Sequence, residues 1–232
     1  MTSSATLSPS SPAKSSLSSL LSGAVRLWLR SQVDQAQTLK IEFSGKNRQL
    51  LRGEIPSIEV EAEGVIYQGL HLGQVLLQAG AVRLNLKQLL KGEPLRLLQP
   101  VPVQINLTIH EQDLTASLAS PLLQEATREV FQGILPDAMD WSGVTIQLRG
   151  DRLHLISPSP QALHLTTRLA IPSQDDIPQI QLQDIQVQGD GHNGIQTFPS
   201  RDIPLDATVS IEDLTCHDGL LHLSGNLQVI VN

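Results

Sequence analysis

The sequence predicts an α+β fold built mainly from antiparallel sheet, with few helices. Many stretches alternate apolar and polar residues one by one, which is typical of strands that bury one face and expose the other. Only two stretches show a clear helical spacing of apolar residues. Apolar residues make up 40% of the 232 residues but aromatic residues only 3%, so we expect an aliphatic core.

The N-terminal stretch MTSSATLSPSSPAKSSL, residues 1–17, is rich in Ser and Pro and is expected to be disordered. Residues 18–232 then form a single domain. The sequence shows neither the basic and apolar regions of a secretory signal nor an apolar run long enough to cross a membrane. We therefore expect a cytoplasmic protein that is at most peripheral at a membrane.

From about Ser18 the apolar residues follow one another at spacings of three and four, which predicts an amphipathic helix. The apolar stripe includes Leu21, Val25 and Trp28. We expect this helix to pack on the protein's own sheet. Because Arg26 and Arg30 flank Trp28, a helix lying in a membrane interface is the alternative.

The strands are predicted from strict alternation. They lie in residues 57–63, 64–86, 101–110, 143–150, 163–171, 180–188, 204–213 and 226–232. The stretch GVIYQGLHLGQVLLQAGAVRLNL, residues 64–86, reads as two strands with a very short turn between them. In IQLQDIQVQ the alternation slips by one residue between Leu182 and Ile185, which indicates a β-bulge.

A second helix is predicted in DLTASLASPLLQEATREVFQGIL, residues 113–135, where Leu114, Leu118 and Leu122 share one face. Pro121 should start this helix or kink it, because proline inside a helix loses a hydrogen bond and clashes with the preceding turn. The stretch LNLKQLLKGEP holds at most one helical turn.

Two helices are too few to cover a flat sheet of about ten one-faced strands. The sheet must curl around the helices, close on itself or leave an apolar groove. An open groove suits a lipid chain, because each buried methylene contributes about 0.8 kcal/mol. A core filled by the protein's own side chains is the alternative.

Charge is unevenly distributed along the chain. Residues 1–100 carry 11 Lys or Arg against 7 Asp or Glu, and residues 101–232 carry 5 against 16. Such asymmetry can orient a protein on an anionic membrane surface, although a merely solvated face is the alternative. Nucleic acid is a poor candidate partner, because the net charge is −7 and no basic residues alternate with aromatic ones.

No motif of a known catalytic type is present, so we expect no catalytic residues and no cofactor. Four histidines, His71, His154, His164 and His222, lie in LHL tripeptides on the polar faces of strands, where no metal-ligand spacing is recognisable. The single cysteine, Cys216, is expected to be a buried structural thiol. We therefore expect neither a metal site nor an enzyme.

Several motifs resemble those of one family. These are LLRG before the first long strand pair, GLHLGQV at the turn and DLTASL at the start of the second helix. They resemble the LmeA-like phospholipid-binding proteins, and most closely the cyanobacterial members. The similarity covers about residues 20–230 and is best over 48–124. It implies a strongly curved antiparallel sheet wrapped around one or two amphipathic helices, similar to a single tubular lipid-binding module.

The resemblance also implies noncovalent binding or transfer of phospholipid, with acyl chains between helix and sheet and the headgroup at a polar rim. The candidate acyl-chain residues are Leu21, Val25, Trp28, Leu84, Val103, Ile105, Leu107, Leu118 and Leu122. The candidate headgroup or membrane-surface residues, chosen by charge, are Lys46, Arg48, Arg52, Lys87, Lys91 and Arg96. Relatives outside the cytoplasm carry a signal or lipid anchor, and its absence here favours a cytoplasmic membrane face. The alternative function is a scaffold or assembly factor of the same fold that binds a protein partner and fills its own groove.

Overall fold

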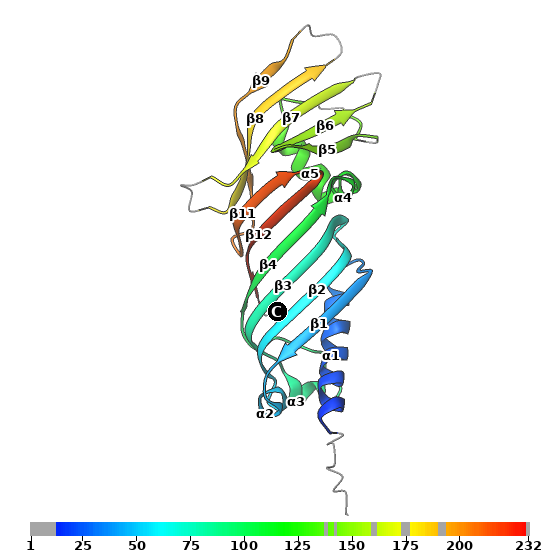
Figure 1. Ribbon diagram of the computed structural model, residues 1–232, viewed down its shortest axis with the longest axis vertical. Helices are drawn as coiled ribbons and strands as arrows, with labels where there is room; N and C mark the ends of the chain where they lie inside the picture. The colour runs from blue at the N-terminus through cyan, green and yellow to red at the C-terminus, as the bar shows by residue number, and fades with distance from the viewer. Residues whose placement is uncertain are drawn as a thin grey trace, which may run out of the picture.

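Two antiparallel sheets, one after the other along the long axis, form most of the molecule (Figure 1). The computed structural model describes residues 13–136, 139–141, 143–158, 162–172, 177–189 and 194–230. Within these residues each sheet has six strands, and neither closes into a barrel. The predicted α+β fold, a curved antiparallel sheet with few helices, is confirmed. The structure adds that the strands divide between two sheets.

Sheet 1 has the order β1-β2-β3-β4-β12-β11. Its strands are β1 Thr38–Ser44, β2 Glu54–Tyr67, β3 Leu70–Arg83, β4 Val101–His110, β11 Val209–His217 and β12 Leu220–Val229. The short turn predicted within residues 64–86 is confirmed, because Tyr67 pairs with Leu70 across two residues, but only one full strand lies in that stretch, since β2 begins at Glu54 and includes residues 57–63. Both turn residues, Gln68 and Gly69, have positive φ, which is the requirement of the type I′ turns that fit twisted hairpins.

Sheet 2 is formed by the chain between β4 and β11. Its strands are β5 Thr145–Arg149, β6 Arg152–Ser157, β7 Leu163–Ala170, β8 Gln179–Gly189, β9 Gln196–Phe198 and β10 Arg201–Pro204. The predicted bulge in β8 is confirmed, because the pairing between β7 and β8 shifts beside Thr167. Asp184 has φ 52° there, and the buried Thr167 hydroxyl donates a hydrogen bond of 2.9 Å to the carbonyl oxygen of Gln183.

The helices are short except for the first. They are α1 Ala13–Ser31, α2 Asn47–Leu51, α3 Leu86–Leu89, α4 Glu111–Ser117 and α5 Pro121–Val130. Helix α1 begins at Ala13, five residues before the expected start, and residues 1–12 lie outside the described part of the chain. None of the helices in the described residues is both long and apolar enough to cross a bilayer.

The single helix predicted over residues 113–135 is two helices in the structure. Pro121 is the first residue of α5, where its missing N–H costs no hydrogen bond. Ser120 caps this helix, because its hydroxyl accepts a hydrogen bond of 3.1 Å from the backbone N–H of Leu123. Helix α3 is the predicted single turn, whereas α2 was not predicted.

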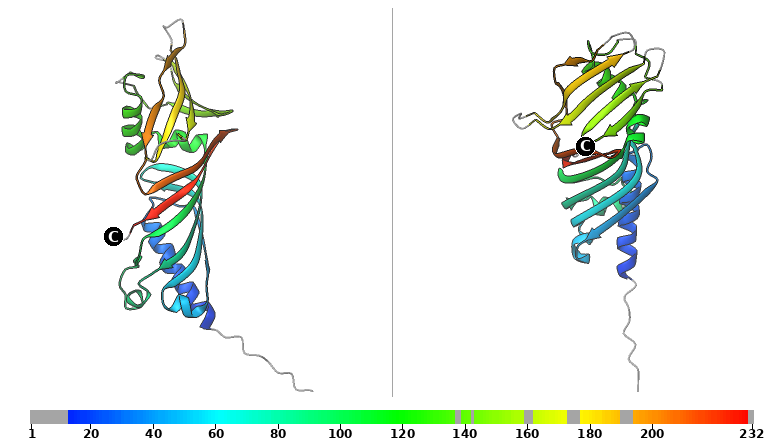
Figure 2. Two further views of the ribbon diagram at one scale, coloured as in Figure 1. Left: turned by 90° about the vertical axis from the view of Figure 1, so that its left-hand side faces the viewer. Right: turned by 45° about the horizontal axis from the view of Figure 1, so that its top comes forward.

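The buried apolar residues form two cores, and sheet 1 contributes to both, because Ile109 of β4 and Leu221 of β12 are buried in the core of sheet 2. The α1 core lies between α1 and one face of sheet 1, and the sheet-2 core lies between sheet 2, α4 and α5. The buried residues of the α1 core are Leu21, Val25, Leu50, Ile55, Val82, Leu84, Leu86, Val101 and Val103. We call the face of sheet 1 that meets α1 the inner face; sheet 1 curves around α1 on this side (Figure 2, left). The expectation that α1 packs on the protein's own sheet is therefore confirmed.

Candidate functional site

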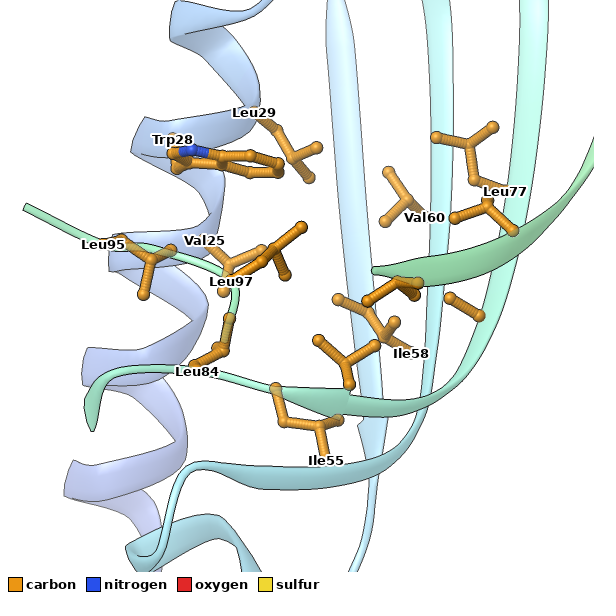
Figure 3. A pocket seen from close by; sticks show the side chains of 14 residues that line it. Val25, Trp28, Leu29, Ile55, Ile58, Val60, Leu77, Leu84, Leu95 and Leu97 are labelled. Atoms are coloured by element: carbon orange, nitrogen blue, oxygen red, sulfur yellow. The ribbon is translucent and has the colours of Figure 1, made fainter. Parts of the chain in front are cut away.

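An apolar cavity lies between α1 and the inner face of sheet 1 (Figure 3). The cavity has a volume of about 90 Å³ that is open to a water-sized sphere. All the space between its walls that no atom fills, including the part open to solvent, amounts to about 620 Å³. Described residues that line the cavity are Val25, Trp28 and Leu29 of α1, Ile55, Ile58 and Val60 of β2, Leu77, Ala79 and Val82 of β3, Leu84, Leu95 and Leu97 after β3, and Val101 and Val103 of β4. Every one of these side chains is apolar or aromatic.

Strand alternation builds the floor of the cavity. Ala79 pairs with Ile58 on one side and Val103 on the other, so these three side chains point to the same face of sheet 1. Leu77, two residues earlier in β3, points to this face as well. Leu76, the neighbour of Leu77 in β3, pairs with Glu61 and points to the opposite face. A pair of adjacent leucines thus lies on opposite sides of the sheet.

Helix α1 forms one wall. Leu21 and Val25, one turn apart, are 1% and 4% exposed and fix the helix to the sheet. Trp28 and Leu29 continue the same stripe and face Val60 across the cavity (Figure 3). The helix therefore packs on the sheet with Leu21 and Val25 and forms the cavity wall with Trp28 and Leu29 near its C-terminal end.

The segment of residues 84–98, which we call the cover segment, forms the remaining wall and contains α3. Its ends are joined by an isolated bridge between Leu84 and Leu97. The buried side chain of Asn85 holds it in shape: its Nδ2 donates to the Pro94 carbonyl oxygen at 2.8 Å, and its Oδ1 accepts from the Arg96 N–H at 2.7 Å. These bonds place Leu97 against the cavity.

Gly53, at the start of β2, allows the cover segment to approach closely. Its φ is +76°, and a Cβ there would lie 2.2 Å from the carbonyl oxygen of Leu84. Its own carbonyl oxygen accepts a hydrogen bond of 2.8 Å from the Leu84 N–H. Only glycine combines this conformation with this contact without strain.

Two groups of cations that are far apart in sequence meet at the end of the molecule that carries α2 and α3 (Figure 1). We call this the basic end. Its cations are Lys46, Arg48, Arg52, Lys87, Lys91 and Arg96, and all six side chains are exposed. Within the described ranges, none of the six forms a salt bridge.

The structure brings together only part of the predicted acyl-chain set. Val25, Trp28, Leu84 and Val103 line the cavity, and Leu21 is buried in the same core beneath it. The other residues lie elsewhere.

Ile105 is half-buried on the inner face of sheet 1, further along β4. Leu107 packs against the sheet-2 core and Leu118 is buried in it. Leu122 is 46% exposed on α5. The last three residues thus belong to a different part of the molecule from the cavity.

The sequence reasoning missed most of the cavity floor and the cover segment. The floor residues Val60, Leu77 and Ala79 carry an alternation signal, but alternation tells only which residues share a face of one strand. Which strands lie beside each other depends on pairing, which a single strand does not encode. The role of Asn85 in holding the cover segment could not be predicted from the sequence, because Asn is common before any helical turn.

The cavity has no chemistry beyond apolar contact. None of the described residues that line it carries a titratable group, and the Trp28 ring N–H is the one polar side-chain group among them. Among the described residues no three His, Cys, Asp or Glu side chains come together as metal ligands. The histidine pair His154 and His164, with ring nitrogens 3.0 Å apart, lies on sheet 2, away from the cavity.

Comparison with known proteins gives one match. The family model described as LmeA-like phospholipid-binding matches residues 13–226, which is nearly the whole chain. No curated protein and no solved structure shows a significant match. The chain therefore belongs to the LmeA-like phospholipid-binding family.

Proposed function

We propose that this chain binds a phospholipid noncovalently, with an acyl chain in the cavity between α1 and sheet 1, and that it catalyses no reaction. The single observation that carries this proposal is a cavity walled entirely by apolar side chains in a member of a phospholipid-binding family. Hydrocarbon is the only part of a phospholipid that such walls favour over water.

The size of the cavity supports part of a lipid rather than a whole one. Pockets for drug-sized ligands measure about 300–1,000 Å³, whereas the volume open to a water-sized sphere here is only about 90 Å³. A single acyl chain fits this description, whereas a second chain and the headgroup would extend beyond the opening. Each methylene buried there would contribute about 0.8 kcal/mol.

The exposed cations of the basic end support a headgroup position there. The cover segment lines the cavity with Leu95 and Leu97 and carries Lys87, Lys91 and Arg96 on its exposed side. A phosphate next to this segment would meet positive charge within a short distance of the apolar walls. Peripheral contact with an anionic membrane surface, and lipid exchange there, follow as parts of the same proposal.

The scaffold alternative predicts a groove filled by the protein's own side chains. The empty apolar space between α1 and sheet 1 favours a ligand over that alternative. No observation in the described residues specifically favours a protein partner, so we develop the lipid-binding function alone.

The adjacent leucines of β3 provide a matched test. Leu77→Gln places an amide in the apolar cavity, whereas Leu76→Gln makes the same change on the opposite face, and both side chains are half-buried in the parent. The purified parent and both variants are compared by native mass spectrometry, with organic extraction of the copurified lipid and thermal unfolding as the control for folding. We expect the parent and Leu76→Gln to carry phospholipid and folded Leu77→Gln to lose it. An apo parent that takes up no lipid from anionic liposomes would refute the proposal.

A further inference from the structure

The two short helices at the basic end carry the same five-residue motif. Residues 48–52 read RQLLR and residues 87–91 read KQLLK, although the two segments lie in different connections of sheet 1. In each motif a cation is followed three residues later by a leucine and four residues later by a second cation. Residues at these spacings share one face of a helical turn.

The two leucines of each motif have opposite environments. The first leucine points inward: Leu50 is buried in the α1 core and Leu89 packs against that core. The second points outward: Leu51 is 51% exposed and Leu90 is 58% exposed. Each motif is thus fixed to the protein by its first leucine and presents its second leucine to solvent between two cations.

Both motifs lie at the same end of the long axis (Figure 1). Residues 46–54 and 83–98 together hold seven cations and two acids. The rest of the chain holds nine cations and 21 acids, and the segment of residues 143–204, which forms sheet 2 at the opposite end, holds four cations and six acids. The molecule therefore carries its excess positive charge at one end of an otherwise acidic chain, which orients it in the field of an anionic surface.

We infer that the basic end is a docking surface for an anionic phospholipid bilayer, with Leu51 and Leu90 inserted into the interface and Arg48, Arg52, Lys87 and Lys91 around them. Unpaired cations beside an isolated exposed leucine match the two layers of such a surface, the charged headgroups and the hydrocarbon below them. A nucleic acid offers the charge but no apolar layer for the leucines.

This inference deepens the proposed function and rests on it for its purpose, because the docking surface includes the cover segment of the cavity. A bilayer held at α3 would lie next to the wall that contains Leu95 and Leu97. Lipid would then pass between bilayer and cavity without crossing bulk water. Sheet 2 would point away from the membrane.

The test is flotation with vesicles of phosphatidylcholine alone and of phosphatidylcholine with phosphatidylglycerol. Each cation at an anionic surface changes partitioning about fivefold, so Arg52→Gln with Lys91→Gln should weaken binding to the anionic vesicles roughly 25-fold. The matched control, Arg128→Gln with Arg201→Gln, removes two exposed cations from the other end and should bind as the parent does.

The apolar part is tested separately. Leu51→Ser with Leu90→Ser should weaken binding to the anionic vesicles at least tenfold, whereas the control Leu122→Ser with Ile195→Ser, two exposed residues at the other end, should have no effect. Binding of the parent should also fall at high salt, because salt screens exposed charges. A parent that does not float with anionic vesicles overturns the inference. An effect of the charge variants without an effect of Leu51→Ser and Leu90→Ser overturns the insertion of the leucines.

Uptake of a short-chain phosphatidylcholine, supplied as monomers, separates docking from cavity binding. Leu51→Ser with Leu90→Ser should take up this lipid as the parent does, because neither leucine lines the cavity and no bilayer is involved. A parallel loss of monomer uptake would place the defect in the cavity and overturn the docking inference. A parent that floats with anionic vesicles but takes up no monomer would refute the proposed function and leave the docking surface intact.

Discussion

Filling the cavity with protein atoms should exclude the lipid without harming the fold. Ala79 lies at the centre of the cavity floor, between Ile58 and Val103. Ala79→Leu adds a branched apolar side chain there and introduces no polar group. Leucine has three more carbons than alanine, and the space that no atom fills is large enough to receive them.

The expected loss of affinity follows from the displaced hydrocarbon. Three methylenes of the ligand would lose their place, at about 0.8 kcal/mol each, or roughly 2.4 kcal/mol. Since 1.4 kcal/mol corresponds to a factor of ten, binding should weaken about 50-fold. The lipid-free variant gains the same burial less about 0.5–1 kcal/mol of side-chain entropy, so it should be more stable by up to about 1.5–2 kcal/mol.

The assay is displacement of a fluorescent fatty acid from delipidated protein, together with thermal unfolding of the same samples. Ala116→Leu is the matched control, because Ala116 is exposed on α4, outside the cavity. It should change neither affinity nor cavity volume. Unchanged affinity in Ala79→Leu together with raised stability would refute the reasoning, because the cavity would then be filled while the lipid still bound.

Other predictions concern the cover segment and sheet 2. Asn85→Ala removes both hydrogen bonds of this buried side chain, so the free energy of unfolding should fall by roughly 1–3 kcal/mol and the amides of residues 84–98 should exchange faster with deuterium. Burial, then the neighbouring His164, lowers the pKa of His154 below its usual 6.5. The folded state thus binds this proton less readily than the unfolded chain, so the melting temperature should fall as the pH drops below 6.5, and His154→Gln should flatten that fall; an identical pH profile would contradict the assignment. Burial raises the pKa of the Cys216 thiol, so alkylation at pH 8 should be slow in the folded protein and fast after unfolding; equal rates would show that the thiol is not protected.

Local patterns predicted the parts of the fold that local physics determines. The alternating stretch of residues 101–110 is strand β4, with the predicted bounds. The slip in alternation after Leu182 is the bulge in β8, because one added residue reverses the face of all that follow. Pro121 starts α5 for steric reasons that need no knowledge of the rest of the chain.

Long-range pairing was beyond the reach of these patterns. Strand β12 pairs with β4 over ten residues, although the chain between them forms sheet 2. The residues of neither strand indicate which other strand it pairs with. Leu107 and Leu118 carry the same apolar signal as Val103 but lie at the sheet-2 core rather than at the cavity. The two groups of cations were recognised separately, and only the structure shows that α2 and α3, which carry them, lie at the same end of the molecule.

The two tryptophans allow the most direct test of where the lipid lies. Trp28 lines the cavity, whereas Trp141 packs against the sheet-2 core. Variants with one tryptophan each, Trp141→Phe and Trp28→Phe, are loaded with a phospholipid brominated on its acyl chains and separated from free lipid and vesicles. Bromine quenches indole fluorescence only at close range. Quenching of Trp28 with unchanged Trp141 emission is the result that the cavity predicts, and quenching of Trp141 with unchanged Trp28 emission would contradict it.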